Sequence, residues 1–491
     1  MRAGVLVALA ALCGLAARAT ASPLLNPNVG GLAFAGPTET HVLAIWYNPA
    51  ALTDPKLDDN KVVVYLGGNL LLRQAEVARF PINPATGQPT GGPAGPRTPF
   101  SAKQPDGFLG FYLRVSEKIV FGLASHTPYR DYGGTEGAAT LDTSDDGPLR
   151  YQRLHTWWYD FWVHPAVSVS IGKNFSLGFG LPFSYTDVRE LSFDRDAATD
   201  CPPPGTVVAG PCGSLASGYE RPENVQRIRV NGGNWSLAVQ FGLLARIRDK
   251  VHLGLSMISP QLWFDRSDVR LDGDGERPNA TVARPGQPDA VGFARLRFRT
   301  PYIFQLGLRW LVTSKTEALL NVRAAKTDTH EGLELRLDSG SFRSADLPER
   351  IVRFRGLGWS ARTDLRANHR LTDAVRVGGG LGFERSPVPY DNTSADTLDG
   401  DTVFANARGE WHPTKGFFFS GGYELGFMLP RTPSRNTFDP RAGSVCAAAE
   451  RSLDDPACAV ALQGRGVPSN AGEYSQLTHT ISLGAGFDWT W

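Results

Sequence analysis

Large apolar residues alternate with small or polar ones over much of the chain, and the last eleven residues, ISLGAGFDWTW, show this most clearly. Successive side chains of a β-strand point to opposite faces, so a period of two predicts a strand. One face of this strand is apolar and ends in aromatic rings, and the other is small or polar. The apolar face comprises Ile481, Leu483, Ala485, Phe487, Trp489 and Trp491.

The same alternation recurs upstream, where glycine, serine or charged residues separate the large apolar ones. In transmembrane β-strands the apolar residues face lipid and the small or polar ones face the lumen. We therefore interpret these segments as strands of a membrane barrel. Their apolar residues are Phe175, Leu177, Phe179, Leu181, Phe183 and Tyr185; Trp235, Leu237, Val239, Phe241 and Leu243; and Val375, Val377, Leu381 and Phe383.

Short and long connections between the predicted strands also alternate. Short turns are expected near residues 117–118, 172–174, 248–250, 314–316, 372–373 and 413–415, and long loops near 81–107, 128–153, 195–223, 271–289, 339–348, 387–401 and 431–475. This spacing predicts fourteen strands, with twelve or sixteen as alternatives. Short turns at one end and long loops at the other are typical of bacterial outer-membrane barrels, whose closure leaves no unpaired sheet edge in lipid. The predicted fold is an all-β, transmembrane, antiparallel β-barrel of fourteen strands over residues 61–491, with an N-terminal plug.

The first 21 residues have the form of a signal peptide. Arg2 precedes an apolar stretch, Val5–Leu15, and Ala19-Thr20-Ala21 has the small-x-small form of a cleavage site. The apolar stretch is too short to span a bilayer, and no later run of about eighteen apolar residues predicts a transmembrane helix. We expect export to the outer membrane, with membrane lipid as a partner, and a monomer.

Charge and cysteine content exclude some function classes. Cleavage would remove Arg2 and Arg18 and no acidic residue, taking the net charge from +1 to −1, so no basic excess favours nucleic-acid binding. Four cysteines remain as two local pairs, which in an exported protein favours two disulfides, with free thiols as the alternative. No histidine lies at metal-ligand spacing from either pair, so we expect no metal. The pairs are Cys201 with Cys212 and Cys446 with Cys458.

Motifs of enzymes are missing from the sequence. It has no Gly-x-Ser-x-Gly elbow, no phosphate-binding P-loop and no His-Glu-x-x-His pair. The glycine run at Gly378 belongs to a predicted strand with no helix after it, which argues against a dinucleotide site. We therefore expect no enzyme activity and no cofactor.

Residues 22–60 precede the first predicted strand and do not alternate. The stretch AIWYNPAAL, from Ala44 to Leu52, carries enough apolar surface to pack, and as a disordered tail it would expose that surface to water. We interpret residues 22–60 as a segment that plugs the barrel lumen; a disordered tail is the alternative.

This segment, NVGGLAFAGPTETHVLAIWYNPAAL, resembles the N-terminal hatch of the FadL/TodX family of outer-membrane transporters for long-chain fatty acids and other hydrophobic compounds. Four further blocks, FGLASHTPY, HPAVSVSIGKNFSLGFG, NWSLAVQFGLLARIRDKVHLGLS and ERSPVPYDNT, resemble family segments in the same order. The residues of this chain that match the hatch motif are Gly30, Gly31, Trp46, Tyr47, Asn48, Pro49 and Ala50.

The resemblance implies a plugged fourteen-stranded barrel that takes up a hydrophobic ligand passively. It also implies a kink in the third strand that opens the wall toward the membrane. Here that strand is predicted from Ile119 to Thr127, and Pro128 lacks the N–H that a ladder needs. His126, Thr127 and Pro128 are the candidate opening. The alternative is that Pro128 simply begins the next loop.

Several arginines are candidates for binding a ligand carboxylate. With Leu296, Phe298, Phe304, Leu306 and Leu308 expected to face lipid, the arginines between them face inward. An arginine fork can hold a carboxylate through two charge-assisted hydrogen bonds. The alternative is pairing with acidic residues of the wall or plug. The candidates are Arg295, Arg297, Arg299, Arg309, Arg353 and Arg355.

Three functions are compatible with this fold. Uptake of a hydrophobic compound is the leading one, and a non-transporting structural or assembly barrel is the alternative. A porin for polar solutes requires an open aqueous lumen, which the plug disfavours.

Aromatic girdles at the two membrane surfaces are also expected. Their residues are Trp157, Trp158, Tyr159, Trp162, Trp263, Phe264, Tyr302 and Trp310.

Overall fold

The computed structural model describes residues 28–53, 62–83, 89–134, 155–196, 225–247, 250–263, 278–297, 300–326, 332–337, 340–345, 347, 350–354, 357–395, 398–434 and 470–489. The predicted signal peptide and all four cysteines of the predicted disulfides lie outside these residues. Among the described residues, no helix is long and apolar enough to cross a membrane.

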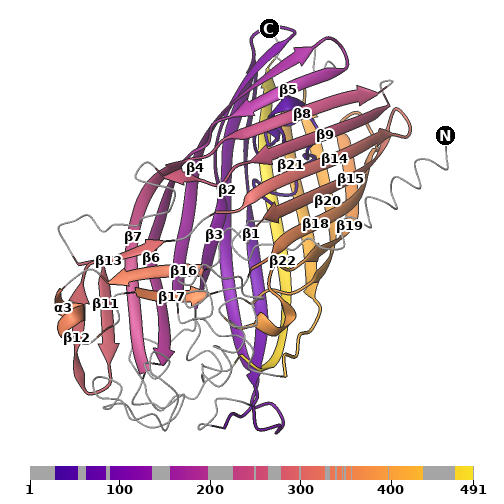
Figure 1. Ribbon diagram of the computed structural model, residues 1–491. Coiled ribbons are helices and arrows are strands. Elements are labelled where there is room, and N and C mark those ends of the chain that lie inside the picture. Colours follow the sequence, from indigo (N-terminus) through magenta and orange to yellow (C-terminus); the bar gives the residue numbers. More distant parts are fainter. Residues whose placement is uncertain are drawn as a thin grey trace, which may run out of the picture.

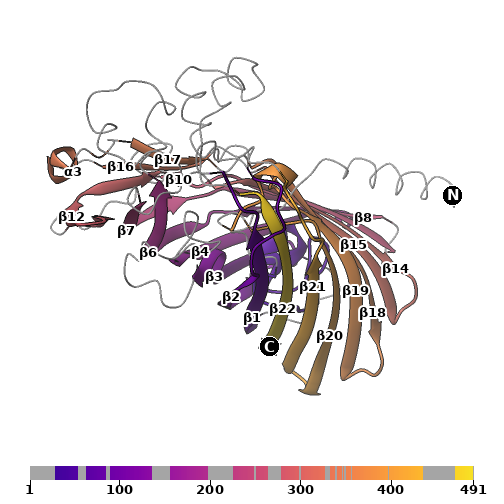
Figure 2. The ribbon, with the colours of Figure 1, turned by 90° about the horizontal axis from the view of Figure 1, so that it is seen from below.

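The chain forms a closed antiparallel β-barrel of fourteen strands, as predicted. Neighbouring strands pair in chain order, and the last strand pairs with the first from Val62↔Trp489 to Arg79↔Gly472, which closes the ring (Figures 1 and 2). Eight spans are single strands: β1 (Val62–Arg79), β2 (Thr98–Arg114), β3 (Ile119–Gly134), β4 (His155–Ile171), β14 (Tyr302–Leu311), β15 (Thr316–Lys326), β18 (Trp359–Arg370) and β19 (Val375–Arg385).

Three further single strands complete the C-terminal wall, and three spans are interrupted. The single strands are β20 (Thr402–Thr414), β21 (Phe417–Met428) and β22 (Gly472–Trp489). The interrupted spans are β5 (Phe175–Gly180) with β6 (Phe183–Asp196), β8 (Gln240–Ile247) with β7 (Val225–Leu237), and β9 (Val251–Ile258) with β10 (Leu262–Trp263). Pro182 and Pro260 lie in two of these breaks, where a residue without an N–H cannot extend the ladder.

Outward side chains of the wall are large and apolar, as the alternation predicts. On β22, Leu483 is 72% exposed and Trp489 50% exposed, whereas Ser482, which precedes Leu483, is buried. The glycines and polar residues of the alternating segments turn toward the interior. This confirms the predicted orientation for the wall strands.

Two predicted loops are shorter than expected. β2 begins at Thr98, so the prediction of a loop over 81–107 is wrong beyond residue 97, and β3 continues to Gly134 instead of ending at residue 127. Prolines and polar residues suggested loops there, yet Glu76 pairs with Pro99 and Leu70 pairs with Pro105 across β1 and β2. The six short turns fall between paired neighbours as expected. We call their end of the barrel the turn end and the other the loop end.

A small second sheet extends beyond the loop end. β13 (Ala294–Arg297), β16 (Gly332–Leu337) and β17 (Arg350–Phe354) form it, and β11 (Ala280–Arg284), β12 (Gln287–Gly292) and the short helix α3 (Gly340–Ser344) lie nearby (Figure 1). These elements share an apolar core with the outer parts of β6 and β7. The chain between β15 and β18 therefore makes a longer excursion than the predicted loop at 339–348.

This second sheet corrects the predicted register around Leu296. Leu296 is only 1% exposed and packs in the core of the second sheet, so it does not face lipid. Trp158 also packs in that core, and Trp162 lies in the lumen, so neither belongs to an aromatic girdle. Alternation identifies a strand with one apolar face, but it does not distinguish a lipid-facing surface from a small protein core.

Candidate functional site in the barrel lumen

Residues 28–53, which we call the hatch, fill the lumen. They contain one helical turn, α2 (Ala44–Tyr47), followed by a 3-10 turn, η2 (Pro49–Leu52). Trp46 and its apolar neighbours are fully buried against inward side chains of the wall. The hatch thus forms one continuous core with the barrel. Its buried apolar residues include Val42, Leu43, Ile45, Trp46 and Leu52.

Gly30 and Gly31 allow the hatch to turn close to the wall. Their φ angles are 73° and 98°, in the left-handed region that favours glycine. The Gly31 N–H donates to Asn28 O at 3.0 Å. A Cβ on Gly31 would come within 3.2 Å of Gly68 O on β1 and 3.3 Å of Ser482 Cβ on β22. Larger residues would push the hatch away from this part of the wall.

Asn48 fixes the middle of the hatch. Its side-chain amide donates to Pro37 O at 2.8 Å and to Leu243 O of β8 at 3.0 Å, and its Oδ1 accepts the Ala50 N–H at 3.1 Å. The last bond caps η2, and Pro49 occupies the first position of that turn, where a missing N–H does no harm. One amide therefore joins two hatch segments to the wall.

Glycines on four wall strands allow the hatch to approach the wall backbone. A Cβ on Gly178 would overlap the backbone at Pro49 and Ala50, and one on Gly242 would overlap Asn48 Oδ1. Gly254 meets Pro37 in the same way, and a Cβ on Gly122 would lie 2.8 Å from Ile45 Cδ1. The small lumen face of these strands is thus occupied by hatch backbone.

Aromatic rings line the hatch on the side of β2–β4. The ring centroid of Trp46 lies 5.3 Å from that of His126 and 5.8 Å from that of Trp162. Phe108 stacks on His126 at 5.7 Å, and Tyr129 lies 6.0 Å from Trp162. We call these five residues the aromatic cluster. Its chemistry suits an apolar or aromatic ligand.

β3 carries a bulge beside the aromatic cluster. His126 pairs with Trp162 of β4 and Tyr129 with Asp160, so β3 has one extra residue across this interval. Pro128 is buried at the bulge, and the strand then continues to Gly134. The alternative that Pro128 begins a loop is therefore wrong.

Asp106 of β2 joins the hatch to this bulge. Its Oδ2 accepts the Gly30 N–H at 3.2 Å and the Asn69 side-chain amide at 3.3 Å, and its Oδ1 accepts the Thr127 hydroxyl. If the hatch moved at Gly30, the hydrogen bonding of Asp106 with Thr127, which precedes Pro128, would therefore change. Asp106 falls within the predicted loop 81–107, so the sequence did not indicate this role; it lies in β2.

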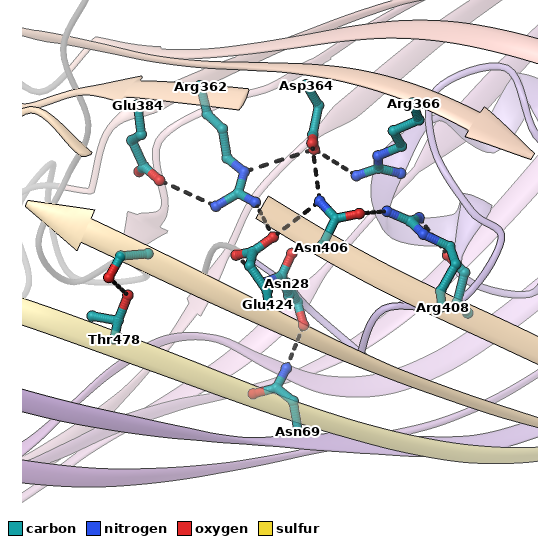
Figure 3. Close-up of polar contacts among 12 residues, drawn as sticks. Asn28, Asn69, Arg362, Asp364, Arg366, Glu384, Asn406, Arg408, Glu424 and Thr478 are labelled. Carbon is teal, nitrogen blue, oxygen red and sulfur yellow. Dashed lines mark hydrogen bonds and ion pairs between the residues drawn. The ribbon is translucent and has the colours of Figure 1, made fainter. Parts of the chain in front are cut away.

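The opposite side of the lumen, lined by β18–β21, is charged. Arg362 donates to Glu424 at 2.6 Å and to Glu384 at 3.2 Å, and its Nε lies 3.8 Å from Asp364 (Figure 3). The hatch joins this network because Asn28 donates to Glu424 at 3.0 Å. The stretch SARTDLRANHR indicates this inward-facing charge in the sequence, because its charged residues alternate with residues that face outward.

Two arginines of this network hold backbone carbonyls of the hatch. Arg366 donates through Nη1 to Ala35 O, and Arg408 donates through Nη1 to Ala33 O, both at 3.1 Å. Arg366 also pairs with Asp364 at 2.6 Å, whereas the second partner of Arg408 is Asn406 Oδ1. Both guanidinium groups are buried.

The structure places the predicted arginines in different surroundings. Arg309 turns inward and pairs with Glu317 of β15 at 2.6 Å. Arg295 is exposed on β13 in the second sheet, away from the barrel wall where it was expected. The backbones of Arg297 and Arg353 lie in β13 and β17, and Arg299 and Arg355 lie outside the described residues. Among the described residues, no group of three metal-ligating side chains occurs.

Solved structures with the same fold include a FadL homologue, a toluene transporter and a monoaromatic hydrocarbon channel, by their descriptions. A Pseudomonas aeruginosa FadL homologue matches with a TM-score of 0.67 and 17% identity over 96% of this chain and 100% of that one. The Pseudomonas putida toluene transporter TodX matches with a TM-score of 0.64 and 10% identity over 96% and 99%. The monoaromatic hydrocarbon channel CymD gives 0.59 and 12% over 96% and 100%. No protein-family model and no curated protein matches the sequence. The predicted resemblance is confirmed for the fold: this chain has the FadL/TodX-like barrel.

Proposed function

We propose that this protein is an outer-membrane channel for the passive uptake of long-chain fatty acids or similar hydrophobic compounds. The observation that carries the proposal is the pairing of a hatch-filled lumen, whose β2–β4 side is aromatic, with a bulge in the adjacent wall strand β3. Its similarity in fold to the FadL homologue, TodX and CymD supports the same class of ligand. The protein acts in the outer membrane as a monomer, after export by its signal peptide.

Transport in this proposal has three steps and no chemical reaction. Loops at the loop end capture the ligand, the aromatic cluster receives its apolar part, and the ligand leaves sideways into the membrane at His126, Thr127 and Pro128. Burial of each methylene group stabilises the bound ligand by roughly 0.8 kcal/mol, so about sixteen of them contribute on the order of 13 kcal/mol before entropy costs. A site that binds this well needs a means of release.

Movement of the hatch supplies that release. Trp46 belongs to both the hatch and the aromatic cluster, so a ligand that displaces Trp46 disturbs the segment from Trp46 to Ala50. At the other end of the hatch, Gly30 shares Asp106 with Thr127, next to Pro128. Ligand entry, hatch displacement and widening of the bulge then form one sequence of events.

A polar-solute porin is disfavoured because hatch residues 28–53 occupy the lumen. The alternative of a structural or assembly barrel without transport shares the fold and needs a functional test. Radiolabelled oleate and toluene should enter cells that express the protein faster than cells that lack it, and oleate should bind the purified protein. Failure of both measurements would favour the non-transporting barrel.

The hatch is tested by replacing Asn48 and Pro49 together with alanine. We expect a change in uptake at equal surface level, because the change removes the bonds from Asn48 to Pro37 and Leu243. A matched control is Asn234→Ala, which removes an amide on β7 whose Oδ1 accepts from the neighbouring Trp235 N–H. Unchanged uptake in the hatch variant would discard hatch movement as the release step.

A further inference from the structure

Arg408 is a buried guanidinium whose partners are all neutral. Its side chain is among the buried charged groups, with the residue only 5% exposed. Within the described part of the chain it donates to Ala33 O and Asn406 Oδ1, and its Nε has no acceptor. A charge in such a place is unfavourable unless a counterion pairs with it. Asp364, Glu39 and Glu424 are close enough to act on this charge, but none of them forms a direct ion pair with it among the described residues.

Four other arginines of the lumen differ from Arg408 because each contacts a carboxylate directly. Arg362 lies between Glu384 and Glu424, Arg366 pairs with Asp364, and Arg309 pairs with Glu317 (Figure 3 shows the first two). Arg376 pairs with Glu317 and, at 3.6 Å, with Glu39 of the hatch. Of these five arginines, Arg408 is the one whose hydrogen-bond partners among the described residues include no carboxylate.

The hatch covers this place with backbone carbonyls. Ala33 O accepts a hydrogen bond from Arg408, and Ala35 O accepts one from Arg366, each at 3.1 Å. Two carbonyl oxygens on adjacent guanidinium groups are a neutral substitute for the two oxygens of a carboxylate, which would bind more strongly because the hydrogen bonds are charge-assisted.

Glycines of β19 form the floor beneath the hatch here. Gly380 pairs in register with Arg366 on one side and Asn406 on the other, and Gly378 pairs with Arg408. A Cβ on Gly378 would come within 3.0 Å of Phe34 Cε1, and a Cβ on Gly380 within 3.0 Å of Arg366 Cγ. Displacement of Ala33–Ala35 would therefore expose bare backbone flanked by two arginines.

We propose that Arg408, together with Arg366, receives the carboxylate of an amphipathic acid when the hatch segment Ala33–Ala35 moves away. The headgroup replaces the carbonyl oxygens of Ala33 and Ala35, so an acid stabilises the displaced hatch and a neutral hydrocarbon does not. This inference rests on the proposed uptake function and adds to it a preference for acids, with a binding site beneath the hatch on β18–β20.

Arg408→Gln tests the site. The substitution removes the charge without leaving a carboxylate unpaired, because Arg408 has only neutral partners. Equilibrium binding of radiolabelled oleate to the purified full-length protein should weaken by about tenfold, the value of one charged hydrogen bond. Binding of oleyl alcohol should not change. Equal loss for both ligands, or no loss for oleate, would overturn the proposal.

Arg227→Gln is the matched control. Arg227 is also 5% exposed, but it lies on β7 and pairs with Asp194 through bonds of 2.9 and 3.2 Å. Any general effect of losing a buried arginine should appear in this variant, and we expect it to bind both ligands as the unmodified protein does. Loss of oleate binding in both variants to the same extent would count against a specific role for Arg408.

A second measurement does not depend on folding of the Arg408 variant. A fluorescent label on Ala35→Cys should report movement of the hatch, after subtraction of the signal from the parent protein treated identically. Oleate should shift the label, and oleyl alcohol at the same occupancy should shift it much less. Equal shifts would contradict the proposal. If oleate, oleyl alcohol and toluene all fail to bind, the proposed function fails; if only the preference for the acid is missing, this inference alone fails.

Discussion

Gly30 of the hatch donates its backbone N–H to the carboxylate of Asp106 at 3.2 Å, and the same carboxylate accepts the hydroxyl of Thr127 beside the β3 bulge. Hatch and bulge thus share one acceptor. Because Asp106 bonds both, removing it should loosen both at once.

Asp106→Ala should therefore raise hydrogen exchange at the Gly30 amide and near Tyr129. Leaving a buried donor without an acceptor costs about 1–3 kcal/mol, so local opening should become roughly 5 to 160 times more frequent. Glu76→Ala is the control, since Glu76 pairs with Arg97 on an exposed surface. Faster exchange at Gly30 without any change near Tyr129 would show that Asp106 does not connect the two.

Gly242→Ala should destabilise the packed hatch. Its Cβ would overlap Asn48 Oδ1 and come within 3.2 Å of Ala50 N. Overpacking of this kind typically costs about 1–3 kcal/mol, so we expect a lower thermal midpoint and faster proteolysis of the hatch. Gly409→Ala on β20 is the matched control, because the nearest atom to its Cβ is a backbone oxygen at 4.0 Å. Equal behaviour of the two variants would argue against tight hatch packing at Gly242.

Deletion of Pro128 should remove the bulge. β3 would then have as many residues as β4 between the His126–Trp162 and Tyr129–Asp160 pairs, so the ladder could become regular. We expect the barrel to form and uptake of oleate and toluene to fall at equal surface level. Pro128→Ala keeps the extra residue and should keep more of the uptake. A deletion variant with full uptake would exclude the bulge as the exit.

Asp399, in the loop between β19 and β20, should make the stability of the loop end depend on pH. Burial raises the pKa of its carboxyl to about 7, and Glu384 acts in the same direction; its Oδ2 has no acceptor or donor partner among the described residues. A folded pKa above the unfolded value of 3.8 means that this contribution is present at acidic pH and is lost as pH rises through about 7.

Asp399→Asn mimics the protonated form. Thermal midpoints of the variant and the unmodified protein should agree below about pH 3.8, where the carboxyl is protonated in both the folded and the unfolded protein. The variant should become the more stable as pH rises, and the difference should be largest near pH 8.5, above the folded pKa of about 7. Asp401→Asn offers a contrast, because Asp401 accepts from Ser386 N–H at 3.0 Å and Arg431 at 3.4 Å. Its loss should destabilise the loop rather than stabilise it. A constant difference between Asp399→Asn and the unmodified protein across this range would contradict the expected effect.

The sequence alone predicted the barrel, its strand number and its outward face, because a period of two and the spacing of turns are local properties. It did not predict the second sheet, since Leu296 alternates in a small core as it would on a lipid-facing wall. The prolines in the first half of β2 predict a loop. Pairing with the neighbouring strand makes this part a strand, which the local pattern does not show.

The candidate site was less predictable because its contacts join distant parts of the chain. Ala33 meets Arg408, and Asn28 meets Glu424, across almost the whole sequence. The sequence pattern predicts that Arg309 faces the lumen, as it does, but the pattern does not single out Arg366 and Arg408, which hold the hatch. Only closure of the ring brings the C-terminal strands next to the N-terminal segment.

The same closure couples the hatch to the wall. The hatch precedes β1 and touches both strands of the β1–β22 seam: Tyr65 Oη donates to Gly30 O at 3.4 Å, and Gly31 lies against Ser482. The hatch therefore contacts both strands that meet when the ring closes, so that packing of the hatch and closure of the seam stabilise each other.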